Sequence, residues 1–160
     1  MTVHDRFAAH ELVHQWWFNY DEGNFDVLER LLTDDCHLSS RTELGTHPHE
    51  AFIRSDSRGR DRALAWTKEH RRHSPYPLRH NAANVHVVAE RADEIDLESY
   101  LFVTQIIDRR PSTLSSGLVH FTLVRQPDGY RIRRKDVVLD SIESQPFEQV
   151  DFVVDRMKTW

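Results

Sequence analysis

Apolar residues near the start of the chain recur at the spacing of an amphipathic helix. Between residues 4 and 20 they include Leu12, Val13, Trp16 and Trp17, which fall on one helical face. The turn-forming residues 21–24 end this segment. The pattern then predicts, in chain order, a helix at 25–32, a strand at 36–43, and helices at 50–53 and 61–73. Between the last two helices, residues 55–62 are polar enough to be mobile.

From residue 78 onward, apolar and polar positions alternate. A period of two is typical of half-buried strands, and it extends over residues 78–89, 95–108, 117–126 and 130–140. Helices followed by a meander of strands predict an α+β fold. A strongly twisted antiparallel sheet of this length curves around the helices, and the curvature predicts a pocket between the two layers.

Length, charge and cysteine content limit the class of protein. With 160 residues and 39% apolar content, the chain suits a single domain over residues 1–160. A net charge of -5 gives no basic surface for a nucleic acid, so we expect no such partner. The sequence has no apolar run of membrane-spanning length and no leader, and Cys36 has no second cysteine to pair with. These features predict a soluble, cytoplasmic protein with no membrane partner.

Several short motifs resemble landmarks of the nuclear transport factor 2-like superfamily. They are Tyr-Asp-Glu-Gly-Asn-Phe-Asp-Val-Leu at 20–28, Leu-Arg-His at 78–80, Asn-Val at 84–85, Asp-Gly-Tyr-Arg-Ile at 128–132 and Leu-Asp at 139–140. The resemblance spans roughly residues 7–140. It implies a cone-shaped sheet wrapped around the N-terminal helices, enclosing a pocket for a small aromatic or polyketide-like compound.

Two branches of this superfamily are similar to different parts of the chain. Residues 19–28 resemble scytalone dehydratase, which shares its fold with the SnoaL-like polyketide cyclases; this implies a lyase or isomerase that works without a cofactor. The second half is more similar to the small (β) subunit of aromatic-ring-hydroxylating dioxygenases. That similarity implies a non-catalytic subunit that supports an iron-carrying partner. A module that only binds a small ligand is a third interpretation.

The resemblance to scytalone dehydratase implies a catalytic site at Tyr20, Asp21 and His80. An imidazole can carry a proton near neutral pH, so His80 is the candidate general base. Asp21 would orient the ring, and Tyr20 would hydrogen-bond a substrate oxygen. The alternative is structural, because a buried histidine-aspartate pair can be a core hydrogen bond and Tyr20 can be helix-end packing.

Further residues are expected to line the pocket. In a regular strand Asn84 shares a face with His80, and the match to the dehydratase directs further side chains of the next two strands inward. The expected substrate-binding residues are Asn84, Tyr100, Phe102, Thr104 and His120. Thr104 and Ser40 stand where the dehydratase has a second histidine and a second tyrosine, so scytalone itself is not the expected substrate.

The remaining polar patterns predict no metal site. The close pairs His47/His49 and His70/His73 lack the spacing of a metal-binding motif, so we expect neither a metal nor a cofactor. The arginine-rich residues 54–72 are typical of a solvated helix face. Alternating charges at 131, 133 and 135 likewise predict an exposed face of the last strand.

Exposed apolar residues on the convex side of the sheet are expected to pair two copies of the chain. The candidates are Val85, Val87, Leu101 and Val103. They predict a homodimer, and a trimer if the similarity to the dioxygenase subunit dominates.

Overall fold

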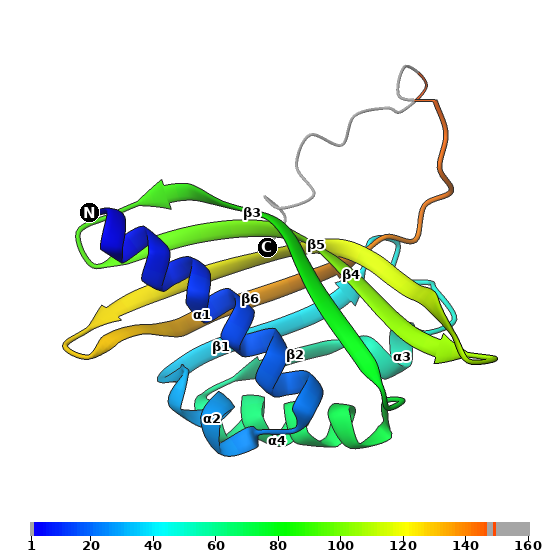
Figure 1. Cartoon of the computed structure of the whole chain (residues 1–160), viewed down its shortest axis with the longest axis horizontal. Helices are drawn as coiled ribbons and strands as arrows, with labels where there is room; N and C mark the ends of the chain where they lie inside the picture. The colour runs from blue at the N-terminus through cyan, green and yellow to red at the C-terminus, as the bar shows by residue number, and fades with distance from the viewer. Residues whose placement is uncertain (1, 147–148, 150–160) are drawn as a thin grey trace.

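Helices occupy the first half of the chain and long strands the second, as the hydrophobic pattern predicts (Figure 1). The structure, a computed structural model, describes residues 2–146 and 149, so the predicted domain at 1–160 extends past the described residues. The elements are α1 (Val3–Glu22), α2 (Phe25–Arg30), β1 (Leu32–Thr42), α3 (Glu50–Ile53), β2 (Ser55–Arg58), α4 (Arg60–His73), β3 (Leu78–Glu90), β4 (Glu94–Ile107), β5 (Arg110–Gln126) and β6 (Gly129–Leu139).

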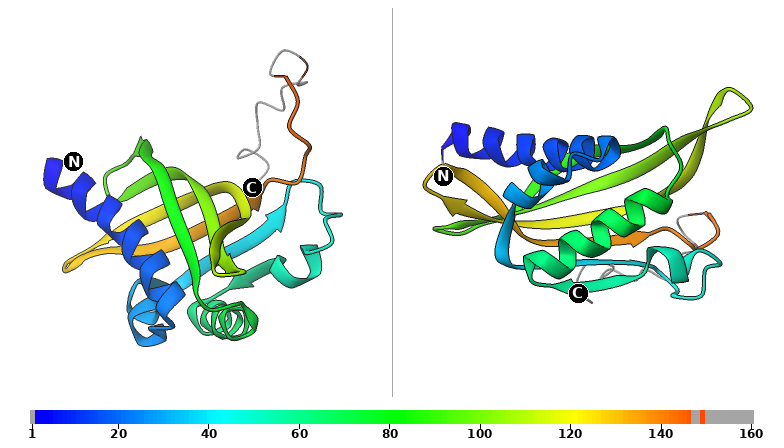
Figure 2. Two further views of the ribbon diagram at one scale, coloured as in Figure 1. Left: turned by 45° about the vertical axis from the view of Figure 1, so that its right-hand side comes forward. Right: turned by 90° about the horizontal axis from the view of Figure 1, so that it is seen from below.

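The strands form a six-stranded sheet in the order β2-β1-β6-β5-β4-β3. Neighbouring strands are antiparallel except β1 and β6, which run parallel, so the sheet is mixed. The antiparallel meander predicted after residue 78 is confirmed as β3 to β6. Parallel neighbours need a long connection between them. Here the connection contains α3, β2, α4 and the first three strands of the meander, β3 to β5. Figure 2 shows the sheet curving without closing into a barrel.

The polar segment expected to be mobile contains an edge strand, β2. It pairs with β1 over four residues, from Ser55 opposite Ser40 to Arg58 opposite His37. The imidazole of His37 also lies 2.6 Å from Asp56. An edge strand can be polar on both faces because backbone hydrogen bonds hold it to its neighbour, so the hydrophobic pattern gives no sign of it.

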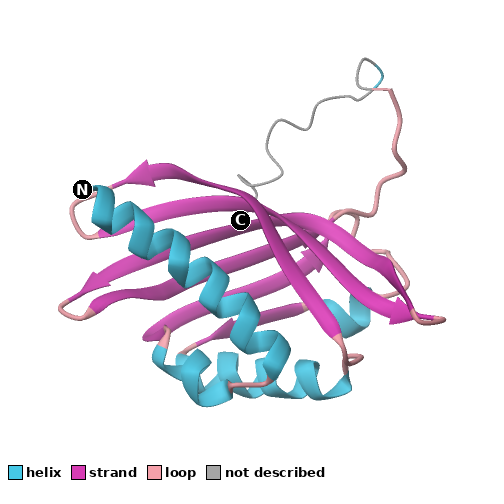
Figure 3. Ribbon diagram, viewed as in Figure 1, coloured by secondary structure: helices cyan, strands magenta, loops and turns pink. Residues whose placement is uncertain are grey.

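The helices cover one face of the sheet (Figure 3). The first helix packs across β3 and also reaches β6, while α4 packs against β1 and β2. Fully buried side chains between the layers include Trp16, Leu28, Leu97 and Phe121. None of the helices in the described part of the chain combines the length and apolar character needed to span a bilayer.

The C-terminal end of α1 is fixed by its capping residue. Gly23 has φ of 71°, in the left-handed region that a residue without Cβ adopts at low cost. The backbone N–H of Gly23 donates to Tyr20 at 3.2 Å, and that of Asn24 donates to Asn19 at 2.9 Å. The last turn of the helix therefore contains Tyr20 and Asp21, and both side chains lie beside β3.

Irregularities in the strands decide which side chains face the helices. In β3 the pairing with β4 shifts between Ala83 and His86, and Asn84 has φ of 54°. In β6 the pairing with β5 shifts near Arg133, because Leu123 pairs with Ile132 and Thr122 with Arg134. A bulge exchanges inward and outward positions beyond it. Strict alternation therefore fails in both strands.

Two residues expected on an exposed dimer face point inward instead. Leu101 is 2% exposed and Val103 is 4% exposed, whereas the intervening Phe102 and the preceding Tyr100 are 44% and 49% exposed. The expectation was wrong because the inward parity of β4 is the reverse of the one inferred from the dehydratase. Val85 and Val87, the other two candidates, pack against the core.

Candidate active site

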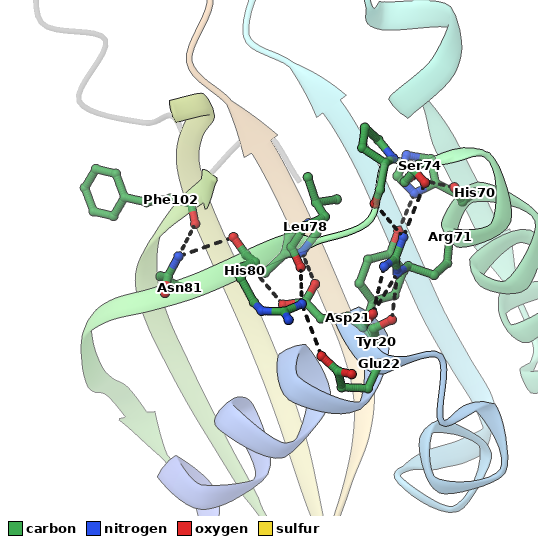
Figure 4. Close-up of polar contacts among 12 residues, drawn as sticks. Tyr20, Asp21, Glu22, His70, Arg71, Ser74, Leu78, His80, Asn81 and Phe102 are labelled. Atoms are coloured by element: carbon green, nitrogen blue, oxygen red, sulfur yellow. Dashed lines mark hydrogen bonds and ion pairs between the residues drawn. The ribbon is translucent and has the colours of Figure 1, made fainter. Parts of the chain in front are cut away.

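Asp21 in the last turn of α1 and His80 near the start of β3 bind each other. Nδ1 of His80 lies 2.6 Å from Oδ1 of Asp21, and the backbone N–H of His80 donates to Oδ2 at 2.8 Å (Figure 4). Both side chains are buried, 9% and 5% exposed. A carboxylate that accepts from Nδ1–H leaves a lone pair on the other ring nitrogen, Nε2.

Aromatic rings enclose the imidazole of His80. The indole of Trp17 lies parallel to it, with 4.9 Å between ring centroids and 5° between planes. The ring of Tyr20 meets it edge-on at 5.0 Å. Burial lowers the pKa of His80, although the hydrogen bond that His80 donates to Asp21 opposes this. The ring is therefore neutral near neutral pH and is able to accept a proton.

The hydroxyl of Tyr20 binds a second histidine. It lies 2.5 Å from Nδ1 of His70, in the last turn of α4. Burial raises the pKa of Tyr20 and lowers that of His70 to about 4, so both groups are uncharged near neutral pH. Nε2 of His70 is buried and has no hydrogen-bond partner within the described residues.

A cavity of about 330 Å³ opens between the helices and the sheet, within the size range of pockets for small organic ligands. Its polar residues include Tyr20 and His70 from the last turns of α1 and α4, and His80 and Lys135 from β3 and β6. Much of the remaining wall is apolar and includes Phe52, Trp66, Leu101, Val103, Leu114 and Val137. The cavity therefore suits an apolar compound with a few polar atoms.

A buried arginine holds the end of α1 in place. The guanidinium of Arg71 donates to the backbone carbonyl of Asp21 at 2.8 Å and to that of Tyr20 at 3.2 Å. It also donates to the carbonyl of Pro75 at 3.0 Å, in the segment leading to β3. The residue is 7% exposed, so the expected solvated face of α4 is wrong at this position.

Lys135 was also expected on an exposed face of the last strand, but it is buried. Lys135 is 7% exposed and lines the cavity. The bulge near Arg133 separates it from the outward-facing charges of β6. Burial lowers the pKa of Lys135 to about 8.

The structure brings together the three predicted catalytic residues but none of the predicted substrate-binding ones. Asn84, Tyr100, Phe102 and Thr104 do not line the cavity, and Figure 4 shows Phe102 pointing away from His80. Asn84 turns outward at the bulge in β3. The three β4 residues alternate with Leu101 and Val103, which do line the cavity.

His120 also lies on the opposite face of the sheet. Its Nδ1 is 3.5 Å from Glu98, and its Nε2 is 3.4 Å from the hydroxyl of Thr122 and 3.9 Å from Asp96. The adjacent Phe121 is fully buried and its ring contacts that of Trp17 on α1. The expected orientation of His120 was wrong because the alternate positions of β5, those of Phe121 and not of His120, face the helices.

The sequence pattern did not predict the roles of His70, Arg71 and Lys135 at this site, although two of these residues leave a signal in it. Arg71 follows the buried residues Ala63 and Thr67 at intervals of four, which is the spacing of one helical face. Lys135 shares its parity with Val137, another residue of the cavity wall. His70 leaves no comparable signal, because its partner is 50 positions away.

Histidines are numerous around the cavity, yet no metal site is formed there. Within residues 2–146 and 149, no three His, Cys, Asp or Glu side chains are grouped closely enough to hold an ion.

Comparison with known proteins places the chain among small α+β domains. The family model of the SnoaL-like domain matches residues 1–136. The small subunit of anthranilate 1,2-dioxygenase from Burkholderia cepacia is 25% identical over 144 residues, covering 87% of this chain and 89% of that protein.

Two solved structures have the same fold. A putative scytalone dehydratase from Novosphingobium aromaticivorans superposes with a TM-score of 0.68 at 15% identity, covering 91% of this chain and 95% of the other. ActVI-ORFA from Streptomyces coelicolor superposes with a TM-score of 0.68 at 20% identity, covering 86% and 98%. Both solved structures show that this chain shares its fold with them, and the similarity to a dioxygenase small subunit comes from sequence.

Proposed function

Because this chain belongs to the SnoaL-like family, we propose that its cavity is an active site for proton transfer on a small organic compound. The reaction is a dehydration, an isomerisation or a cyclisation that the side chains of the chain carry out without a cofactor. The observation that carries this proposal is the pair of Asp21 and His80 at the wall of a largely apolar cavity.

In this proposal His80 is the general base. Its Nε2 takes a proton from a carbon next to a carbonyl group, and the electrons of the C–H bond form the double bond of an enolate. Asp21 keeps the proton of the neutral ring on Nδ1 and stabilises the imidazolium that forms. His80 then returns the proton, either to a leaving hydroxyl, which departs as water, or to another carbon.

Tyr20 is the group that binds the developing oxyanion. The phenol stays protonated because burial raises its pKa, so it stabilises the oxygen by a hydrogen bond rather than by giving up its proton. The Tyr20 hydroxyl is free to donate to a ligand when His70 carries its own proton on Nδ1 and donates to the phenol oxygen. We assign that tautomer to the ligand-bound form.

The test is deuterium exchange in a ketone that fits the cavity. The full chain is incubated with 1-tetralone in D₂O, and exchange at the carbon next to the carbonyl is followed by proton NMR. We expect His80→Gln to slow exchange by roughly 10²–10⁴-fold, which is the usual contribution of a general base. His120→Gln is the matched control and should leave the rate unchanged, because His120 lies on the other face of the sheet. Exchange by the wild type no faster than by buffer would refute the proposal.

The 25% sequence identity with the anthranilate dioxygenase small subunit favours a second candidate function, that of a supporting subunit of an oxygenase. Phe102 and Tyr100, exposed on the face of the sheet away from the cavity, would contact the partner. In that case a Rieske-type large subunit encoded nearby should co-purify with this chain. Phe102→Asp should prevent co-purification, while His80→Gln should not.

A further inference from the structure

Lys135 projects from β6 into the wall of the cavity. Its strand neighbours in the sheet are Phe121 of β5 and Leu38 of β1, and both are buried apolar residues. The ammonium group therefore cannot reach solvent along the sheet. The open space available to it is the cavity that it lines.

The ammonium of Lys135 lies against two indole rings. Its Nζ is 4.9 Å from the ring centroid of Trp16 and 5.0 Å from that of Trp17, which stabilises the positive charge. An ammonium also has three N–H donors that need acceptors. Within residues 2–146 and 149, Lys135 makes no hydrogen bond and no ion pair.

The nearby carboxylates are engaged elsewhere. Asp136 is adjacent in sequence, but its side chain is on the opposite face of the sheet. There it accepts a hydrogen bond from Ser39 at 2.6 Å and pairs with Arg134. Asp21 is bound to His80. Asp140, farther along the chain and also in the cavity wall, accepts from the hydroxyl of Ser116 at 2.6 Å.

Basic nitrogen atoms therefore outnumber acidic groups around the centre of the cavity. Lys135 is close enough to both histidines to lower the pKa of His70 and of His80. A buried cation without an acceptor is costly. A ligand that supplied an anionic oxygen would remove that cost, whereas a wholly neutral ligand would not.

We propose that Lys135 binds the carboxylate of the ligand, so that the cavity takes apolar organic acids whose ring system lies against Trp66, Leu101 and Val137. This inference rests on the proposed function to the extent that the ligand occupies the same cavity. Lys135 sets specificity, and the proton transfer remains with His80.

The experiment compares two probes of the same shape, 2-naphthoate and its neutral amide, 2-naphthamide. Binding to the full chain is measured by isothermal titration calorimetry near neutral pH. We expect the wild type to bind the carboxylate about tenfold or more tightly than the amide, because a hydrogen bond between charged partners is stronger than one between neutral partners. Lys135→Met should abolish this preference.

Two further variants make the result decisive. Lys68→Met removes the cation of a lysine on α4 that lies over Phe25, 5.9 Å from its ring centroid, and should keep the preference for the carboxylate. Lys135→Gln gives the same test if the methionine variant does not fold, as judged by circular dichroism. The inference is overturned if the wild type binds both probes equally or binds neither, or if the preference survives in the Lys135 variants.

This outcome is separable from that of the ketone experiment. Loss of the carboxylate preference on substitution of Lys135, with no ketone exchange, would keep the anion site and reject the proton-transfer function. Ketone exchange that depends on His80, with no preference for the carboxylate, would keep the proton-transfer function and reject the anion site.

Discussion

The two carboxylate oxygens of Asp21 bind two different groups of His80, one the ring Nδ1 at 2.6 Å and the other the backbone N–H at 2.8 Å. The backbone N–H can only donate, so its oxygen partner is fixed as an acceptor. This second contact locks the rotation of the carboxylate and aims the remaining oxygen at the imidazole.

Asp21→Asn should therefore reverse the tautomer of His80. The amide oxygen would keep the backbone N–H, and the amide nitrogen would then face Nδ1 and favour a proton on Nε2. We expect ketone exchange to fall by roughly 10²–10⁴-fold, because the base has lost its lone pair toward the cavity. Nitrogen-15 NMR of the imidazole reports the tautomer. Asp26→Asn, on the exposed side of α2, is the control, and an unchanged tautomer in the Asp21 variant would contradict the prediction.

Tyr20→Phe should destabilise the protein and slow the reaction. It leaves Nδ1 of His70 buried without a partner, which costs roughly 1–3 kcal/mol of the free energy of unfolding, measurable by urea denaturation. Loss of the oxyanion donor should lower the exchange rate by roughly 10²–10³-fold. Tyr76→Phe alters an exposed tyrosine and should change neither quantity. Equal effects of the two substitutions would argue against a special role for Tyr20.

Arg71→Met should lower the stability of the protein by freeing the C-terminal end of α1. The substitution removes the donors to the carbonyls of Tyr20, Asp21 and Pro75, and we expect the free energy of unfolding to fall by roughly 3 kcal/mol. Arg72→Met changes the exposed neighbour on the same helix and should cost less than about 0.5 kcal/mol. Similar urea midpoints for the two variants would contradict the view that Arg71 clamps the end of α1.

Lys135→Met should raise stability in a pH-dependent way. The pKa of Lys135 falls from 10.5 in the unfolded chain to about 8 in the folded one. Below both values the residue is charged in both states and its burial penalty is fully present. Between them the unfolded state binds the extra proton, so wild-type stability rises with pH. At about pH 7 the variant should be more stable by roughly 3 kcal/mol, and the gap should narrow as pH rises toward 10.

The other ionisable groups that face Lys135 do not account for this pH dependence. The pKa values of His70 and His80 are lowered, so both are neutral across this range, and the pKa of Tyr20 is raised above it. Urea denaturation of wild type and variant at several pH values measures the gap. A gap that stays constant from pH 7 to 10 would show that Lys135 does not titrate as the structure indicates.

The order and type of the main elements could be predicted from local pattern alone. Trp16 and Trp17 lie on the buried face of α1, and the prolines of residues 74–77 end the helical half because proline lacks an amide donor. Alternation after Leu78 gave the strands of the meander. These signals are local, since each depends on neighbours within a few positions of the chain.

The direction of individual side chains could not be predicted in the same way. One bulge turns Asn84 outward, another separates Lys135 from the outward-facing arginines of β6, and β4 faces the helices with the parity of Leu101 rather than Phe102. A shift of one residue exchanges the two faces of a strand. Such a shift depends on pairing with a neighbouring strand and leaves little trace in the strand itself.

By itself the sequence determined the α+β architecture and, through its resemblance to a known family, the grouping of Tyr20, Asp21 and His80. Only the tertiary structure decided that His70 meets Tyr20, that Arg71 anchors the end of α1, and that a buried lysine faces the cavity. The physical reason is the distance along the chain between the residues that make contact. Helical and strand periodicity are encoded by adjacent residues, whereas these contacts join α1, α4, β3 and β6 across 50 or more positions, and they form only when the whole sheet has set its register.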